Sequence, residues 1–335
     1  MRTKKPLLAA IAAGLLLIPA ACGSDDSDTL TVYSGRDEEL VASLFEDFTD
    51  SSDIEVEVRY GETPELATTI AEEGDASPAD VFFSQDAGAL GLLQKEELLA
   101  ELPSDVLDEV PSAFRSAQGE WVGVSARARI VAYNRDAVAE ADLPASVLDL
   151  TDEKYRGEVG WAPGNASFQS FVTGLRRVEG EQATERWLRD MKGNDTQVYE
   201  ENSAIRDAIA SGELDYGLIN HYYVAEAQAE EGPDYPVAIY EPPNGDVGAL
   251  VNVAGAGVLE SSDSKDSAEE FVAFLLSRQA QEYFAEQTKE YPLRDGIAAD
   301  GDLVPLAEIE QPDVDLSDLD DLRGTVDMLQ RTGVL

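Results

Sequence analysis

The chain has 335 residues, of which 68 are acidic and 24 are basic, so its formal net charge at pH 7 is −44. A surface this acidic repels phosphates, which excludes nucleic acid as a partner. The whole sequence contains one cysteine and one histidine. These counts also disfavour a disulfide framework, a His-dependent catalytic triad and a metal site of several histidines or cysteines.

At the N-terminus, the first predicted element is an export signal. Three of the first five residues are basic, and an apolar run from Pro6 to Ala21 follows them. This pattern is typical of a secretory signal peptide, and the apolar run falls short of the ~20 residues that a transmembrane helix needs.

The residues around Cys22 predict how this signal is removed. The run Ile18–Cys22 resembles the bacterial lipobox, with Pro19 where leucine is usual. The resemblance implies that residues 1–21 are cleaved off and that Cys22 is acylated. Residues 22–28 are small, polar and acidic, as expected of a flexible tether. The alternative is an ordinary signal peptide that is cleaved nearby and leaves a free thiol.

After the tether, strand and helix patterns alternate along the chain. Predicted strands cover 29–35, 54–60, 80–84, 130–133, 159–161 and 216–220. Predicted helices cover 37–48, 63–74, 165–178, 181–191, 202–210, 222–229 and 267–285, and a further helix begins near residue 86. Such alternation predicts an α/β fold with mostly parallel sheets covered on both faces. About 310 residues after the signal exceed what one compact core usually supports, so we expect two lobes.

In α/β sheets, ligands bind beyond the carboxyl ends of the strands. The positions that follow the predicted strands are 34–38, 85–86, 164–167, 199–202 and 220–223. They offer hydroxyls, carboxylates, amides and open helix N-termini, and the sequence contains no P-loop, nucleophile elbow or HExxH motif. An oxygen-rich set of this kind suits a hard cation better than a soft one.

Tyr222 and Tyr223 lie at a strand-to-helix turn, just after Asn220. Adjacent aromatic residues usually pack in the core, but at such a turn both phenols can face one crevice. A phenolate oxygen is a hard ligand, and a trivalent cation can deprotonate a phenol far below its usual pKa of about 10. Packing and cation binding both remain open from these residues alone.

Seven segments in order carry a resemblance that spans the chain from about Leu30 to Leu335. They are Leu30–Arg36, Ser77–Phe83, Asp86–Leu90, Ser125–Arg129, Val198–Ser203, Leu218–Tyr223 and Glu290–Leu293. Together they resemble the ferric-iron-binding proteins of bacterial ABC importers, which are members of the type II periplasmic-binding-protein superfamily. The resemblance implies two α/β lobes joined by crossing strands, with a hinge and an interlobe cleft. Lobe 1 would comprise 29–128 plus 254–303, and lobe 2 would comprise 129–253 plus 304–335.

The resemblance also implies a ferric iron site. In that family paired tyrosines bind the ion, which assigns Tyr222 and Tyr223 as ligands. Asp37 stands where many members have a histidine, and Gln85 stands where they have a glutamate. Asp37 and Asp86, which is next to Gln85, would supply the carboxylate oxygens.

A third tyrosine, which some members carry at the start of the helix near residue 165, is absent here. The chain thus looks more like the members that complete the site with a bound anion such as phosphate or carbonate. The residues implied to hold this anion are Asn165, Ala166, Ser167, Asn202 and Asn220. Asn202 can equally be a helix N-cap. Arg127 and Arg129 can neutralise buried carboxylates or cover the hinge, and His221 is better interpreted as a structural neighbour of the site than as a ligand.

By the same resemblance, the protein is a monomeric carrier and not an enzyme. It would sit at the outer face of the cytoplasmic membrane, attached through its lipid only, and deliver iron to the permease subunits of an ABC transporter. One alternative is the same fold binding a polyamine, thiamine or a phosphonate. Others are an extracellular enzyme that uses these carboxylates and a ligand-sensing lobe of a receptor.

Overall fold

The computed structural model describes residues 29–301 and 303–335. The predicted signal peptide, the tether and Cys22 lie outside these residues. Within them, no helix combines the length and the apolar character that a membrane span requires.

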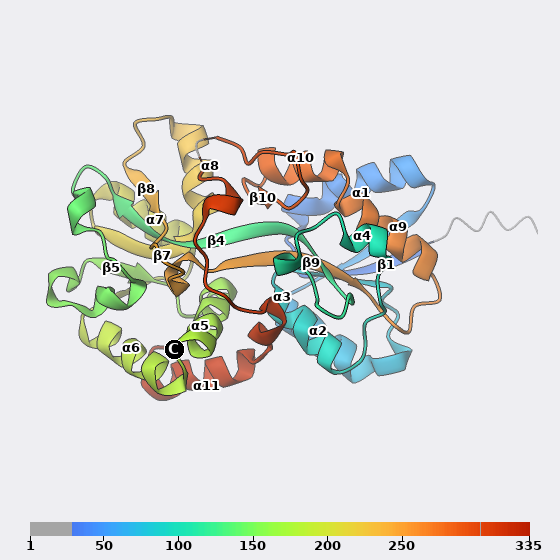
Figure 1. Ribbon diagram of the computed structural model, residues 1–335, viewed down its shortest axis with the longest axis horizontal. Helices are drawn as coiled ribbons and strands as arrows, with labels where there is room; N and C mark the ends of the chain where they lie inside the picture. Colours follow the sequence, from blue (N-terminus) through green and yellow to red (C-terminus); the bar gives the residue numbers. More distant parts are fainter. Residues whose placement is uncertain (1–28, 302) are drawn as a thin grey trace, which may run out of the picture.

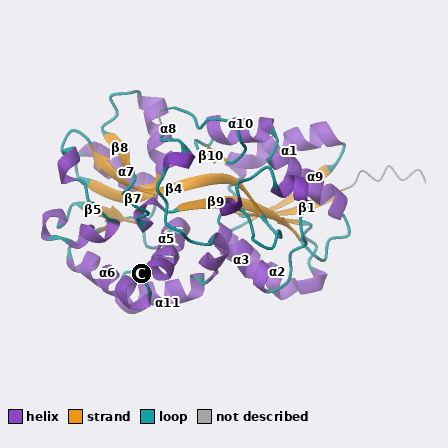
Figure 2. Cartoon of the chain, viewed as in Figure 1, coloured by secondary structure: helices purple, strands orange, loops and turns teal. Residues whose placement is uncertain are grey.

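A sheet runs through the whole molecule in the order β2-β1-β3-β9-β4-β7-β5-β6, and β8 and β10 pair with β4. Figure 2 shows the strands along the middle of the molecule with helices around them. The strands are β1 (Thr29–Ser34), β2 (Glu55–Tyr60), β3 (Val81–Ser84), β4 (Val122–Asn134), β5 (Val159–Trp161), β6 (Gln197–Val198), β7 (Tyr216–Asn220), β8 (Val237–Tyr240), β9 (Val251–Val258) and β10 (Tyr291–Pro292).

The helices form two groups, one around each end of this sheet (Figure 1). Around lobe 1 lie α1 (Glu38–Ser52), α2 (Thr63–Glu73), α3 (Ala87–Lys95), α4 (Ser104–Leu107), α9 (Lys265–Leu275) and α10 (Arg278–Glu286). Around lobe 2 lie α5 (Ala166–Val178), α6 (Glu181–Gly193), α7 (Asn202–Ser211), α8 (His221–Glu231) and α11 (Leu322–Thr332).

Strand β4 belongs to both lobes. Its residues Val122–Ala128 pair with β9 in lobe 1, whereas Arg129–Tyr133 pair with β7 in lobe 2. The exchange of partners therefore falls between Ala128 and Arg129, and Figure 1 shows β4 and β9 extending side by side from one lobe toward the other.

The prediction of mostly parallel sheets holds only at the two ends of the sheet. There β1 pairs in parallel with β2 and β3, and β5 does so with β6 and β7. In the centre the prediction is wrong, because β9 is antiparallel to β3 and β4, and β4 is antiparallel to β7, β8 and β10. The central strands carry the chain between the lobes in opposite directions, so they cannot be neighbours in a parallel βα repeat.

Most predicted elements agree with the structure, but the helix predicted over 267–285 is two helices. α9 ends at Leu275, and Ser277 begins α10 by accepting a hydrogen bond from the Ala280 N–H at 3.2 Å. Both helices bury apolar residues such as Phe271 and Phe284, so the hydrophobic periodicity continues across the break and conceals it.

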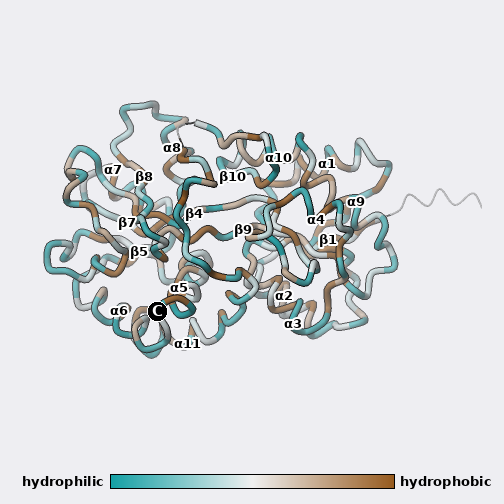
Figure 3. The backbone as a smooth tube through the Cα atoms, in the orientation of Figure 1, coloured by the Kyte–Doolittle hydropathy of each residue, from teal (hydrophilic) through white to brown (hydrophobic). Residues whose placement is uncertain are grey.

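Buried apolar residues lie along the central strands and on one face of most helices, and Figure 3 colours stretches of both as hydrophobic. One buried cluster fills lobe 1, extends along β4 and β9, and continues to residues of α7, β7 and α8 in lobe 2. A second cluster fills lobe 2, where Trp161, Phe168, Phe171 and Trp187 meet mostly edge to face. The strands are thereby fixed from both sides, and their carboxyl ends meet between the lobes.

The C-terminal segment links the two lobes a further time. Its short helix Leu316–Asp320 packs so closely on α3 that a Cβ atom on Gly91 would lie 2.3 Å from the Ser317 carbonyl oxygen. The Asp320 carboxylate lies 2.8 Å from Lys95 of α3 and 3.2 Å from Arg177 of α5. This segment therefore holds α3 next to α5, and the N-termini of both helices reach the site described below.

Candidate functional site

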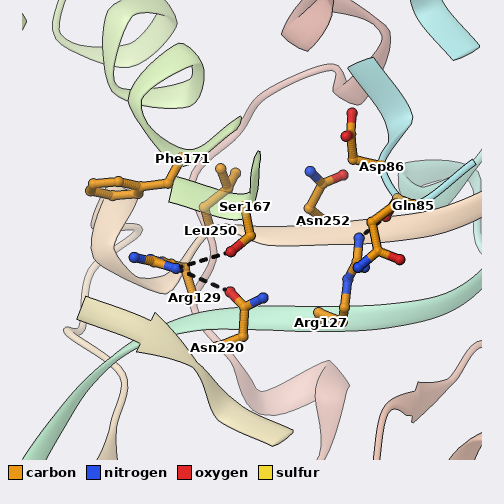
Figure 4. A pocket seen from close by; sticks show the side chains of 9 residues that line it. All are labelled: Gln85, Asp86, Arg127, Arg129, Ser167, Phe171, Asn220, Leu250 and Asn252. Atoms are coloured by element: carbon orange, nitrogen blue, oxygen red, sulfur yellow. Dashed lines mark hydrogen bonds between the residues drawn. The ribbon is translucent and has the colours of Figure 1, made fainter. Parts of the chain in front are cut away.

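A pocket lies where β4 changes partners, between the carboxyl ends of strands from both lobes (Figure 4). The residues that line it are Gln85, Asp86, Arg127, Arg129, Ser167, Phe171, Asn220, Leu250 and Asn252. The predicted positions after β3, after β5 and after β7 thus converge here, as expected for an α/β sheet.

Arg129 forms the lobe 2 wall of this pocket. Its Nη1 atom lies 3.3 Å from the Asn220 amide oxygen and 3.4 Å from the Ser167 hydroxyl, and its ring neighbours are Phe168 and Phe171. Burial lowers the pKa of Arg129 to about 9, against the opposing effect of Tyr222 and Tyr223. Its Nε–H has no protein partner, so the guanidinium group is buried with an unused donor and no carboxylate beside it.

On the lobe 1 side, Glu290 is the centre of a buried ion cluster. Its carboxylate accepts two hydrogen bonds from Arg36, at 2.9 and 3.0 Å, and lies 3.8 Å from Nε of Arg127. Burial raises the pKa of Glu290, but Arg36 and Arg127 outweigh it, so the net direction is down. One carboxylate faces two guanidinium groups, which leaves a fixed excess of one positive charge. Nη1 of Arg127 has no partner.

The structure brings the two predicted tyrosine ligands together at the start of α8. The ring centroids of Tyr222 and Tyr223 lie 4.4 Å apart, with an interplanar angle of 30°. Burial, and then Tyr223, raises the pKa of Tyr222 well above its usual value, although Arg127 opposes the shift. Tyr222 is therefore a neutral phenol that lies close to several fixed positive charges.

The two predicted carboxylates differ in their surroundings. Asp86 is buried and caps α3, because its carboxylate accepts hydrogen bonds from the N–H groups of Gly88 and Ala89. In Figure 4 it points away from the two guanidinium groups. Asp37 is exposed and precedes α1 without capping it. Burial lowers the pKa of Arg36, but Glu290 outweighs it, and Tyr222 and Asp37 add smaller upward effects. Tyr222 and Asp37 therefore lie near the same guanidinium group from different lobes.

The predicted anion-binding residues surround the start of α5 and α7. Asn165 caps α5, with its amide oxygen 3.0 Å from the Ser167 N–H, and Ala166 is the first residue of that helix. Ser167 and Asn220 line the pocket. Asn202 is fully buried, and neither its amide oxygen nor its amide nitrogen has a partner. Asn202 does not cap α7, so the alternative of a helix N-cap is wrong.

In the part of the chain that the structure describes, no three His, Cys, Asp or Glu side chains are close enough to share a metal ion. The oxygen atoms that this site can offer to a metal ion thus come from phenols, single carboxylates and amides, and guanidinium groups lie next to them.

Sequence reasoning assigned no role at the site to Glu290 or Asn252, and it included Arg36 among the candidate positions 34–38 without giving it a role. Arg36 and Glu290 are 254 positions apart, and no local pattern indicates that they meet. The interpretation that Arg127 neutralises a buried carboxylate is confirmed, whereas for Arg129 it is wrong, since its neighbours are neutral groups.

Comparison with known proteins agrees with this geometry. Residues 76–315 match the family model described as bacterial extracellular solute-binding protein. The chain is 33% identical over 330 residues to the Fe(3+)-binding periplasmic protein of Serratia marcescens, covering 98% of this chain and 97% of the relative. Iron-bound HitA from Pseudomonas aeruginosa superposes with a TM-score of 0.84 at 35% identity, covering 91% and 99%. Trichodesmium IdiA (FutA), in complex with iron and citrate ligands, gives a TM-score of 0.79 at 28% identity, covering 91% and 99%.

The buried ion cluster predicts a strong effect of Glu290→Gln. The change leaves two guanidinium groups buried without a counter-charge, so we expect the free energy of unfolding in urea to fall by about 3–5 kcal/mol at pH 7. Glu282→Gln, which breaks the exposed pair with Arg278, is the control and should cost less than about 1 kcal/mol.

The same cluster predicts how this difference depends on pH. Because the folded-state pKa of Glu290 is lowered, its contribution is present above the unfolded pKa of about 4.3 and is lost as the pH falls through the folded value. The stabilities of wild type and Glu290→Gln should therefore converge in acid. Equal stabilities at pH 7 would contradict the assignment.

Proposed function

The chain belongs to the bacterial extracellular solute-binding proteins, and we propose that it captures ferric iron between its two lobes and delivers it to the permease of an ABC importer. As a member of this family it acts outside the cytoplasm. The family consists of solute-binding proteins, and the proposal assigns no catalytic step to this chain.

The observation that carries the proposal is the pair of adjacent phenols at Tyr222 and Tyr223. Both residues lie in the turn that follows β7, so a single ion can contact both phenol oxygens. A phenol with a raised pKa is protonated at neutral pH, and only a cation with a strong preference for hard anionic oxygen displaces that proton. Ferric iron has this preference, and the relatives named above are ferric or iron-bound proteins.

The two guanidinium groups in the pocket make some of the candidate solutes less favourable than others. Arg127 and Arg129 line the pocket, and two buried positive charges disfavour an organic cation such as a polyamine or thiamine. They also favour ionised over neutral phenols at Tyr222 and Tyr223. An anionic organic solute such as a phosphonate fits the same charges, and it remains the second candidate.

We further propose that an anion binds together with the iron. Unpartnered donors on Arg127, Arg129 and Asn202 are groups that a small anion can satisfy, and the N-terminus of α5 adds backbone N–H groups and a favourable dipole. Phosphate and carbonate suit this set. Citrate accompanies iron in the Trichodesmium relative. The anion would fill coordination positions that Tyr222, Tyr223 and Asp37 leave open.

Of the two proposed carboxylate ligands, Asp86 is the less favourable one. Its carboxylate already satisfies two N–H groups of α3, so iron binding through it would uncap that helix. Asp37 has no such cost, and it lies on lobe 1, opposite the tyrosines of lobe 2. Closure of the lobes around the β4–β9 hinge would bring the two sides together.

Replacing the phenol oxygens tests the iron site. Tyr222→Phe and Tyr223→Phe keep the rings, and each should weaken ferric binding by more than about 100-fold, since second-shell changes alone cost 10–100-fold. Adding ferric citrate to wild type should produce a visible phenolate-to-iron band that weakens in each variant and vanishes in the double variant. Tyr133→Phe, in β4 outside the pocket, is the control. Wild-type colour and affinity in the double variant would place the site elsewhere.

The anion is tested by iron titrations in buffer freed of phosphate and carbonate. Iron binding should weaken there and recover on adding either anion, because two ligands that stabilise each other are coupled reciprocally. Ser167→Asp should weaken binding by repelling the anion, whereas Ser104→Asp, which adds the same charge on exposed α4, should not. If adding phosphate or carbonate does not change the affinity for iron, the proposal that an anion binds together with iron is wrong.

The anchor is tested at Cys22, which we propose is acylated. The wild-type protein should fractionate with the membrane, and Cys22→Ser should move it to the soluble fraction. Mass spectrometry of the mature N-terminus provides the direct measurement. A wild-type protein that is soluble and carries an unmodified thiol would refute the lipid anchor and leave the iron site unaffected.

A further inference from the structure

His221, the first residue of α8, is fully buried and uses both ring nitrogens. Its Nδ1 atom accepts a hydrogen bond from the Ala128 N–H at 3.1 Å, and its Nε2 atom lies 3.0 Å from the Lys289 carbonyl oxygen. A backbone N–H can only donate and a carbonyl can only accept, so the ring is neutral and carries its proton on Nε2. Neither nitrogen is available to a metal ion.

Two aromatic contacts fix the imidazole ring further. It stacks on Tyr291, with centroids 4.5 Å apart and an interplanar angle of 25°. Its other neighbour is Tyr222, whose ring lies 5.9 Å away at 88°, edge to face. The imidazole therefore lies between the first proposed iron ligand and a buried aromatic residue of β10.

The partners of His221 belong to the other lobe. Ala128 is the last residue of β4 that pairs with β9 before the strand changes partners. Lys289 and Tyr291 lie in the turn and strand that follow α10 in lobe 1. His221 itself begins a helix of lobe 2. The side chain thus ties the turn that carries both tyrosines to the crossover point between the lobes.

No side chain caps the start of α8. Asn220 precedes α8 but makes no capping hydrogen bond, and its amide oxygen accepts from Arg129 instead. The two hydrogen bonds of His221 therefore tie the tyrosine turn to lobe 1, while Arg206 of lobe 2 holds the same turn by donating to the Tyr223 carbonyl oxygen at 3.3 Å.

We propose that His221 is a positioning residue for iron binding, which holds the Tyr222 phenol at a fixed place beside the hinge and the lobe 1 guanidinium groups. The inference rests on the proposed function. Without these hydrogen bonds the start of α8 can shift, and binding iron must first order the two phenols. Loss of these hydrogen bonds should therefore weaken iron binding and alter the iron–phenolate geometry, in addition to lowering stability.

The test compares variants that remove or restore the acceptor for the Ala128 N–H. His221→Phe keeps the stacked ring and removes both hydrogen bonds, and His221→Gln, whose amide lies farther from the backbone, is used if the Phe variant does not fold. His221→Asn places an amide oxygen near the position of Nδ1 and is the rescue variant. Tyr291→Phe is the control for the stack, because the Tyr291 hydroxyl has no partner.

Folded protein is titrated with ferric citrate, and affinity and the wavelength of the visible band are recorded. We expect roughly tenfold weaker binding and a shifted band in His221→Phe or His221→Gln, values nearer to wild type in His221→Asn, and no change in Tyr291→Phe. A folded Phe or Gln variant with wild-type affinity and band would overturn the positioning role, as would an Asn variant no better than Phe. If wild type itself gives no band, the proposed function fails, and the positioning role fails with it.

Discussion

The exchange of hydrogen-bonding partners along β4 is the constraint on which the rest of the structure depends. Side chains two residues apart on a strand point to the same face, yet Arg127 and Arg129 belong to different lobes. Arg127 contacts Gln85 and Glu290 of lobe 1, whereas Arg129 contacts groups of lobe 2. If a separate element carried each guanidinium group, their separation would change with every movement of the lobes. The shared strand keeps both groups at the base of the cleft, next to the tyrosine turn.

This arrangement has an electrostatic consequence. Around Tyr222 there are three buried guanidinium groups, on Arg36, Arg127 and Arg129, and the buried carboxylate of Glu290, while the buried carboxylate of Asp86 offsets Arg127 from the far side of the pocket. Buried charge without a counter-charge is costly, and the pKa of Arg129, lowered by burial to about 9, is one expression of that cost. Ionised phenols and a bound anion would each offset the excess. Ferric iron ionises the phenols, so in the proposed function the cation and the anion each make the other easier to bind.

The sequence predicts the parts of this site that are local. The βα units at both ends of the sheet follow from hydrophobic periodicity, and the tyrosine pair follows from its place at a strand-to-helix turn. The sequence does not predict β9, because glycine and alanine, which are depleted in strands, separate its valines. Gly255 is required there, since a Cβ atom would lie 2.8 Å from the Val122 carbonyl oxygen. The Arg36–Glu290 pair joins residues far apart in sequence, and the capping role of Asp86 depends on the orientation of one side chain. These features require the tertiary structure.

The connections between the lobes bear on how the site would assemble. The chain passes between them along β4, along β9 and again through the C-terminal segment, where Lys95 and Arg177 of opposite lobes share Asp320. A rotation about the β4–β9 crossover moves residues near Ala128 very little and residues farther away much more. The tyrosine turn, tied to Ala128 through His221, lies near such an axis, whereas Asp37 is exposed at the start of α1 and caps nothing. The two phenols would therefore form a fixed half of the iron site, and closure would add the lobe 1 carboxylate last. In this order of events the ion first meets the groups that must lose protons, and the closed form that a permease can distinguish arises only after they have done so.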